Sequence, residues 1–393
     1  MAKFRLRTLN HISARGLARL PLDRFEHSSD EPTPDAILVR SADMHAMEIV
    51  PSVCAVGRAG AGTNNIPIPA LSARGIPVFN TPGANANAVK ELVVAGLLLA
   101  LRNVPAALRF VDGLTDSGAE LDRRVEDGKK NFVGVELPGR TLGIVGLGRI
   151  GSLVADTAIR MGLDVTGFDP EITVEAAWSL PSLVRKAQSI DEILRASDFV
   201  TLHVPLLPAT KQLMNAERIR AMKRGAVLLN FSREAIVDVN AVLEALHSGH
   251  LKAYVCDFPD ARFRGEPGVI ALPHLGASTL EAEENCAVMV ADQVRDYLVD
   301  GNIVNAVNFP TATMPRESPY RVGIANSNVP NMLGQISTVM AQAGLNIHNM
   351  LNKSRGDMAY TLVDVDSPVP ESVIAGLRAI GGVLSVRYLP AEE

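Results

Sequence analysis

The chain has 393 residues, of which 47% are hydrophobic and 21% are charged, and its formal net charge is −5. Because single hydrophobic cores rarely grow much past about 250 residues, this length predicts two or three domains. The acidic balance argues against a nucleic-acid-binding protein, which would normally present a basic face.

The cysteines and the apolar segments indicate a cytoplasmic protein. Cys54, Cys256 and Cys286 lie far apart and form no CxxC motif, which is typical of reduced thiols, and no metal site is expected. The N-terminus lacks the apolar region of a secretion signal. The longest apolar stretch, 92–101, is half of the roughly 20 residues that a membrane span needs, so a buried helix explains it better.

Strands and helices alternate along the chain, which favours parallel sheets covered on both faces. In the first segment, apolar runs at 36–40, 53–56 and 76–80 predict strands. Pro77 indicates that the third strand lies at an edge or begins there. Near Ala88 the pattern changes to that of a strong helix.

A second α/β run follows from Pro138, and its predicted strands end in polar residues. This placement is informative, because ligands of open α/β sheets bind outside the carboxyl ends of the strands. The polar residues at these ends are Gly146, Asp169, His203, Asn230, Asp257 and His274.

The last part of the chain has its own pattern. Ser278 to Glu281 resembles a capping box that opens a long helix running to about Gly301, which returns the chain to the first domain. The stretch 309–319 is rich in Pro, Thr and Ser and predicts a linker. From about Tyr320 the order β-α-β-β-α-β indicates a ferredoxin-like unit.

A glycine motif, GxGxxG, follows an apolar strand and opens a helix with one buried face. Gly146 permits the tight turn, Gly148 lets the backbone approach a pyrophosphate, and Gly151 allows close packing of the helix on the strand. Asp169 ends the next strand about twenty residues later, where a carboxylate binds ribose hydroxyls and repels a 2′-phosphate. The pattern predicts NAD rather than NADP; the alternative is an ordinary glycine turn beside an exposed aspartate.

Two further residues suit the oxidation of a 2-hydroxy acid. Arg233 lies just past a strand, and its guanidinium can bind a carboxylate with two hydrogen bonds. His274 lies at the end of another strand, and histidine is the residue type most suited to reversible proton transfer near neutral pH. Taken alone, they would more often be a surface ion-pair residue and a structural histidine, but both lie on the same predicted rim as the glycine loop.

The motifs GLGRIG, NFSREAIVD and PHLGAST, in this order, resemble the D-isomer-specific 2-hydroxyacid dehydrogenase family. The resemblance implies that Arg233 orients the substrate carboxylate and keto oxygen and that His274 is the acid/base. It also implies that Asp257 lies by the nicotinamide carboxamide. Further cofactor contacts are expected from Arg149, Ile150, His203, Pro205, Phe231, Ser232 and Gly276.

The chain departs from the family pattern in two places. Glu234 stands where the family usually has a glycine. The family also supplies a glutamate that hydrogen-bonds the histidine, but the segment 257–267 is shorter here and Arg262 falls at that position. Asp260 and Glu266 are the available acids; Asp260 is preferred as the catalytic partner, and the alternative is that the histidine has no acidic partner.

The stretch 56–65 and the turn at 80–82 resemble the branch of the family that acts on 3-phosphoglycerate. A phosphorylated substrate needs cations from the first domain, and the resemblance supports Arg58 most and Arg74 next. Backbone N–H groups near Gly60 can add donors. For Arg40, a solvated ion pair is about as good an explanation.

The segments around Asn326 to Gly334 and Gly344 to Ile347 resemble an ACT domain, a module that pairs sheets between subunits and binds amino acids. The resemblance nominates Asn326, Asn328 and Asn346 as an effector site for L-serine. The alternative is a purely structural dimerisation module.

These observations predict an α/β chain with two Rossmann-like or flavodoxin-like parallel-sheet domains and a C-terminal ferredoxin-like domain. The expected boundaries are 1–88 with 283–308 for substrate binding, 89–282 for NAD binding and 318–393 for regulation. The expected reaction is NAD-dependent oxidation of 3-phospho-D-glycerate to 3-phosphohydroxypyruvate in a homo-oligomer without nucleic-acid or membrane partners. The alternatives are another D-2-hydroxy acid, such as 2-hydroxyglutarate, or a non-catalytic NAD(H)-sensing protein.

Overall fold

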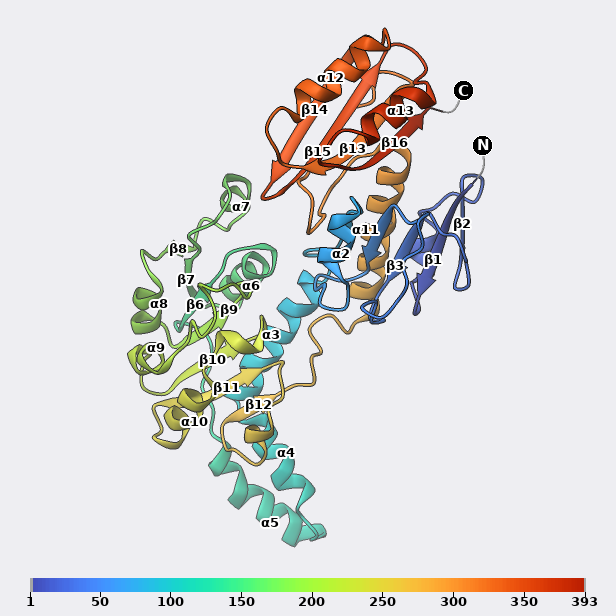
Figure 1. The fold of residues 1–393 in the computed structure, drawn as a ribbon. Helices are drawn as coiled ribbons and strands as arrows, with labels where there is room; N and C mark the ends of the chain where they lie inside the picture. Colours follow the sequence, from blue (N-terminus) through green and yellow to red (C-terminus); the bar gives the residue numbers. More distant parts are fainter. Residues whose placement is uncertain (1–2, 392–393) are drawn as a thin grey trace. The chain divides into compact units, whose positions relative to one another are not determined.

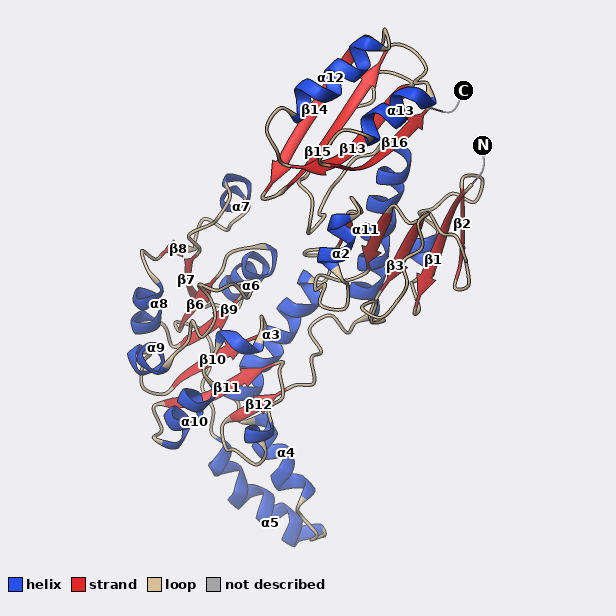
Figure 2. Cartoon of the chain, viewed as in Figure 1, coloured by secondary structure: helices blue, strands red, loops and turns tan. Residues whose placement is uncertain are grey.

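A computed structural model describes residues 3–391 (Figures 1 and 2). The described chain forms two compact units. One unit comprises the residues up to Asn85 together with those from Leu280 onward, and the other is Ala86–Thr279. The predicted fold class is confirmed: two sheets are wholly parallel and a smaller C-terminal sheet is antiparallel.

The first unit contains a five-stranded parallel sheet in the order β2-β1-β3-β4-β5, the flavodoxin-like order. As Pro77 indicated, β5 lies at an edge. The two N-terminal strands were not predicted, because charged residues alternate along the first one and only its Leu6 is buried. The strands are β1 (Phe4–Leu9), β2 (Phe25–Ser28), β3 (Ala36–Val39), β4 (Ala55–Arg58) and β5 (Val78–Phe79).

Helices α1 (Ala14–Leu17), α2 (Ile68–Ala73) and α11 (Leu280–Asp300) belong to the same unit. The long helix α11 packs directly on β4. A Cβ atom added at Gly57 would lie 2.6 Å from the side chain of Val290, so a residue without a side chain is needed for this approach. The approach anchors α11 to the centre of the N-terminal core.

The second unit contains a seven-stranded parallel sheet in the order β12-β11-β10-β9-β6-β7-β8, which includes the Rossmann order. Its first strand, β6, lies between β9 and β7, so the strand order reverses there and the sheet has its topological switch point beside β6. The strands are β6 (Thr141–Val145), β7 (Asp164–Phe168), β8 (Arg185–Lys186), β9 (Phe199–Leu202), β10 (Ala226–Asn230), β11 (Leu251–Cys256) and β12 (Val269–Ala271).

Helix α3 (Ala86–Leu101) packs against β10 and β11, as the apolar stretch predicted for a buried helix. The charged segment that follows forms helices α4 (Val104–Asp112) and α5 (Gly118–Lys129). The other helices are α6 (Arg149–Arg160), α7 (Val174–Trp178), α8 (Ile190–Ala196), α9 (Ala216–Ala221) and α10 (Val239–His247), with short 3-10 turns at Lys130–Phe132, Glu234–Ile236 and Ala261–Phe263.

No single helix within residues 3–391 has the length and apolar character to cross a membrane. Helices α3 and α4 meet that criterion only as a pair, across a bend of 65°.

The C-terminal module, defined here as residues 320–390, has the predicted β-α-β-β-α-β order. Its four strands form an antiparallel sheet in the order β14-β15-β13-β16. One core, which includes Ile324 and Ile336, joins the helices to this sheet. The elements are β13 (Tyr320–Ser327), α12 (Met332–Gln342), β14 (Ile347–Arg355), β15 (Met358–Val365), α13 (Glu371–Arg378) and β16 (Val383–Pro390).

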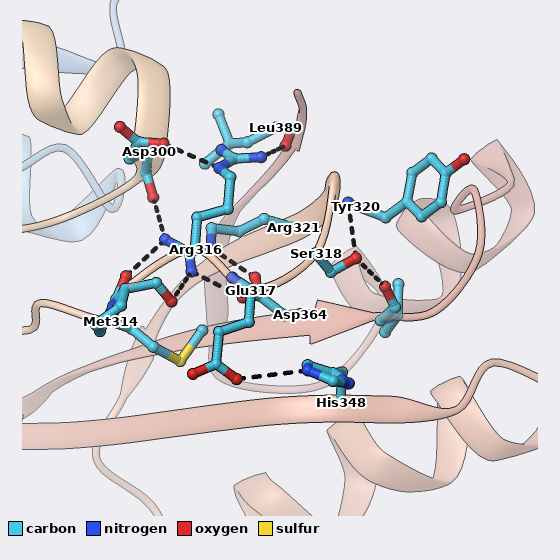
Figure 3. A network of polar contacts seen from close by, with 12 residues as sticks. Asp300, Met314, Arg316, Glu317, Ser318, Tyr320, Arg321, His348, Asp364 and Leu389 are labelled. Carbon is cyan, nitrogen blue, oxygen red and sulfur yellow. Dashed lines mark hydrogen bonds and ion pairs between the residues drawn. The ribbon is translucent and has the colours of Figure 1, made fainter. Parts of the chain in front are cut away.

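Three arginines from the linker and the module bind the last four carbonyl groups of α11, which find no N–H donor within the helix. The Tyr297 carbonyl also accepts a hydrogen bond from the Gly301 N–H at 3.0 Å. The Arg387 guanidinium donates to the carbonyls of residues 297 and 298, Arg316 to that of 299, and Arg321 to that of 300, at 2.9 to 3.1 Å. Cations are favourable at a helix C-terminus. Arg321 also pairs with Asp364, and both side chains are completely buried (Figure 3).

Candidate active site

The glycine loop after β6 has the close contacts that its sequence predicts. Gly146 has φ of 94°, and a Cβ atom there would lie 2.5 Å from the carbonyl oxygen of His203. A Cβ atom at Gly151 would lie 2.0 Å from the carbonyl oxygen of Gly146, so the first turn of α6 requires a glycine. At Gly148, by contrast, no atom of the described residues beyond its own chain neighbours lies within 4 Å of an added Cβ. The space beside Gly148 is therefore open to a ligand.

Helix α6 begins at Arg149, and no side chain of the described residues caps its N-terminus. Its first N–H groups can therefore bind an anion, favoured by the helix dipole. The Asp169 carboxylate accepts hydrogen bonds from the backbone N–H groups of Leu147 (2.8 Å) and Glu171 (3.0 Å). Because a carboxylate has further lone pairs, Asp169 can also accept from a ribose hydroxyl. These residues fit a dinucleotide that has no 2′-phosphate.

His203 follows β9 beside this loop. Its Nε2 lies 3.0 Å from the Thr201 hydroxyl, and its Nδ1 is buried with no hydrogen-bond partner among residues 3–391. Although part of the residue is exposed, burial of the ring lowers the pKa of His203 to about 3. The imidazole is therefore neutral near pH 7. Pro205 is exposed just beyond it.

Arg233 is positioned by a buried asparagine at the end of β10. The Asn230 amide donates to the Arg233 carbonyl (2.9 Å), and its oxygen accepts from the Ser232 N–H (3.1 Å). The Ser232 hydroxyl donates to the Leu202 carbonyl (2.6 Å), and Phe231 is buried. These contacts fix the turn and leave the Arg233 side chain exposed. The sequence places Asn230 only among the polar ends of the predicted strands and does not predict this positioning role. The pattern that indicates it is an amide side chain at the end of an otherwise apolar strand.

His274 lies three residues after β12, not at the strand end itself. Its φ of 58° is unusual for a non-glycine residue, and its exposed side chain makes an edge contact with the Phe258 ring at 5.3 Å. The buried Asp257 carboxylate accepts hydrogen bonds from the backbone N–H groups of Leu275 and Gly276, both at 2.7 Å. Asp257 therefore holds the loop immediately after the histidine.

The two acids considered as partners of His274 are bound to other residues. The Arg262 guanidinium donates to both oxygens of Asp260, and these hydrogen bonds lower the pKa of Asp260 to about 2. Glu266 lies 2.6 Å from Nε2 of His247. In the described part of the chain, residues 3–391, neither Asp260 nor Glu266 forms a hydrogen bond or an ion pair with His274.

The first unit brings Arg58 and Gly60 together at the carboxyl end of β4. A Cβ atom at Gly60 would lie 2.6 Å from the Arg58 guanidinium, so the glycine leaves room for it to fold over the loop. Arg40 forms a 2.5 Å ion pair with Glu283. Arg74 lies apart from them. It is the C-terminal cap residue of α2 and precedes β5, so it lies toward the amino end of that strand, whereas Arg58 lies at the carboxyl end of β4.

The structure does not bring the three asparagines of the predicted effector site together. Each forms its hydrogen bonds with a different partner. Asn326 is buried, donates to the Ser327 carbonyl (2.8 Å) and has an oxygen without a partner within residues 3–391. Asn328 donates to the Gly356 carbonyl (3.0 Å). Asn346 is bound through its backbone N–H to Asp366. Asn331 is the N-terminal cap residue of α12 and has the left-handed conformation (φ of 63°), which asparagine adopts more readily than most residues.

Comparisons with known proteins agree with this geometry. The family model for the D-isomer specific 2-hydroxyacid dehydrogenase, NAD binding domain, matches residues 104–276. D-3-phosphoglycerate dehydrogenase of Haemophilus influenzae is 35% identical over 356 residues, or 87% of this chain and 83% of that protein. The Escherichia coli K12 protein of the same name is 34% identical over 85% of this chain and 81% of its own.

Among solved structures, the TT0316 protein of Thermus thermophilus matches with a TM-score of 0.63 and 28% identity, over 77% of this chain and 100% of its own. The glycine loop and Asp169 fit the NAD that the matched domain binds. The chain therefore belongs to the D-isomer specific 2-hydroxyacid dehydrogenase family and is an NAD-dependent dehydrogenase.

Proposed function

We propose that this chain oxidises 3-phospho-D-glycerate to 3-phosphohydroxypyruvate, the first step of L-serine biosynthesis. The observation that carries the proposal is that Arg233 and His274 follow strands of the same parallel sheet as the glycine loop. The carboxyl ends of parallel strands lie at one edge, where ligands bind. The relatives named D-3-phosphoglycerate dehydrogenase support the choice of substrate.

Each residue has a defined task in this proposal. NAD⁺ supplies the hydride acceptor when it is bound. Arg233 holds the substrate carboxylate, because a guanidinium matches a carboxylate with two hydrogen bonds. His274 takes the hydroxyl proton on an imidazole nitrogen. Arg58 and the N–H groups near Gly60 bind the phosphate.

The acidic partner of His274 has two candidate solutions. Asp260 stays a prediction, and its two hydrogen-bonded oxygens favour the alternative in which the histidine has no acidic partner. In that case the Asp257 hydrogen bonds to the following backbone hold the loop that carries His274.

We assign 1–88 with 283–308 to substrate binding, 89–282 to NAD binding and 318–393 to regulation, and propose that the C-terminal module is an ACT domain. Its β-α-β-β-α-β order supports this assignment. L-serine is the proposed effector, and inhibition of initial rates by added serine tests it. If rates do not respond to serine, the module is an assembly device.

We also propose a cytoplasmic homo-oligomer. Three large apolar side chains near α4 are more than half exposed: Leu108, Val111 and Val133. Clustered exposed apolar side chains mark surfaces that a second subunit covers. The edge strand β14 offers a second surface for pairing. Sedimentation velocity of the purified chain tests whether it is larger than a monomer.

The catalytic assignment is tested with His274→Ala. Loss of a general base is expected to lower kcat for NADH formation by about 10²–10⁴-fold. His247→Ala is the matched control, because His247 is another exposed histidine of the same unit and is bound to Glu266. Turnover by His274→Ala at the rate of His247→Ala would rule out the assigned role.

A further inference from the structure

The first unit contains a cavity of about 540 Å³ that no step of the proposed reaction uses. On one side it is lined by residues around Cys54 and by the end of α2 with Arg74, and on the other by α13 and β16 of the C-terminal module. This volume is typical of sites for small metabolites. The cavity lies toward the amino end of β5, whereas Arg58 lies at the carboxyl end of the neighbouring strand β4.

The lining of this cavity is strongly cationic. It includes Arg74, Arg378 and Arg387, and none of its lining residues is an aspartate or glutamate. Such a concentration of like charge in a concave surface raises the local concentration of anions. The lining chemistry therefore selects an anionic ligand.

The three guanidinium groups differ in what already binds them. Arg387 donates to the last turn of α11 and lies 4.5 Å over the Tyr297 ring, so its position is fixed. Arg74 donates to the carbonyls of Ile49 (2.6 Å) and Val50 (3.0 Å). Neither arginine forms an ion pair with a carboxylate among residues 3–391. Their positive charge is therefore held in place without a neutralising partner.

Arg378 is the more adaptable group. Its ion pair with Glu371 measures 3.1 Å, and both side chains are more than half exposed. Exposed pairs of this kind contribute little and exchange readily with other partners. Arg378 can therefore turn to a ligand in the cavity at small cost.

We propose that this cavity binds a small phosphorylated metabolite, with Arg74 and Arg378 as its ligands. Guanidinium groups bind phosphate oxygens through paired, charge-assisted hydrogen bonds. Between the two sides of the cavity, the Ser385 hydroxyl donates to the Gly75 carbonyl at 3.1 Å. A bound phosphate adds a second bridge, from α2 to α13, and so favours the docked position of the C-terminal module. The site is a regulatory one, separate from the residues assigned to catalysis.

The test measures binding of inorganic phosphate by calorimetry at constant ionic strength. The parent is Arg58→Gln, which removes the proposed phosphate contact of the substrate. Adding Arg378→Gln to this parent is expected to weaken phosphate binding about tenfold or more, because a charge-assisted contact is lost. Adding Arg123→Gln is the control: Arg123 is also an exposed helical arginine paired with an exposed glutamate, but it lies on α5 in the other unit.

Two results would overturn the proposal. One is a parent that binds no phosphate, and the other is equal weakening by Arg378→Gln and Arg123→Gln, which would reflect net charge alone. A second readout follows docking. Phosphate is expected to slow proteolysis within 309–319 in the wild-type chain but not in Arg378→Gln, whose catalytic rate without phosphate stays unchanged.

Discussion

At the scale of single residues, the three glycines of the cofactor loop have different tasks, as the motif predicts. Gly146 and Gly151 have protein atoms where a Cβ would lie, whereas within residues 3–391 Gly148 has none within 4 Å apart from its chain neighbours. The first two are therefore required by the fold, and Gly148 is required only by a ligand that approaches the backbone.

This difference predicts opposite behaviour of two alanine variants. Gly151→Ala is expected to lower the melting temperature, because the Gly146 carbonyl must move. Gly148→Ala is expected to keep the wild-type melting temperature but to bind NADH about tenfold more weakly or worse. Thermal unfolding and NADH fluorescence titrations measure the two effects. Equal melting temperatures for both variants would contradict the packing argument.

His203 predicts a pH dependence of stability. Burial holds the pKa of His203 at about 3, below its ordinary value of 6.5, so the unfolded state binds the proton more readily. Its contribution is present in full above pH 6.5 and is lost progressively as the pH falls toward 3. In His203→Gln, the free energy of unfolding in urea should therefore change less between about pH 7.5 and about pH 4.5.

The matched control for this measurement is His27→Gln, which replaces an exposed histidine of β2. The control should retain the wild-type acid sensitivity. Identical pH dependence in His203→Gln and wild type would show that the buried ring does not contribute.

At the scale of elements, regular patterns predicted the structure and irregular ones did not. The apolar run of α3 and the strand–glycine–helix sequence of β6 and α6 carry strong local signals. Strand β1 alternates charged and apolar residues with a single buried side chain, and α5 has almost no buried face. Their conformations depend on neighbours that are distant in sequence, which a local pattern does not contain.

The same limit applies to the site. Arg233 and His274 follow strands and could be predicted from the sequence, as could the glycine loop. The bonding of Asp260 to Arg262 could not, because several acids of one irregular loop compete for nearby cations and only the folded loop decides among them. The family resemblance names Arg74 next after Arg58 as a substrate contact, but Arg74 precedes a strand and Arg58 ends one.

The buried pair Arg321–Asp364 predicts a stability effect that belongs to the C-terminal module (Figure 3). Asp364→Leu leaves a buried guanidinium without its carboxylate and is expected to cost about 3–5 kcal/mol of unfolding free energy. Glu317→Gln is the control, because the Glu317–His348 pair is 3.4 Å long and half-exposed; its effect should stay within about 0.5 kcal/mol. Denaturant unfolding followed by circular dichroism compares the two. Equal stability of both variants would show that the buried Arg321–Asp364 pair adds no stability.

At the scale of the whole molecule, chain order and structural units do not coincide. The unit that contains the N-terminus is completed by α11 and the C-terminal module, while the sheet with the glycine loop is inserted between them. The loop of His274 leads directly into α11, and α11 ends where Arg316, Arg321 and Arg387 bind its carbonyls. One continuous segment thus connects the proposed acid/base to the module.

Initial rates of NADH formation at mildly alkaline pH identify the substrate. We expect kcat/KM for 3-phospho-D-glycerate to exceed that for D-2-hydroxyglutarate by about tenfold or more, because only the former has a phosphate for Arg58. Arg58→Gln should remove most of this preference. Turnover of D-2-hydroxyglutarate but not of 3-phospho-D-glycerate, or NADH binding without turnover of either acid, would contradict the proposed reaction.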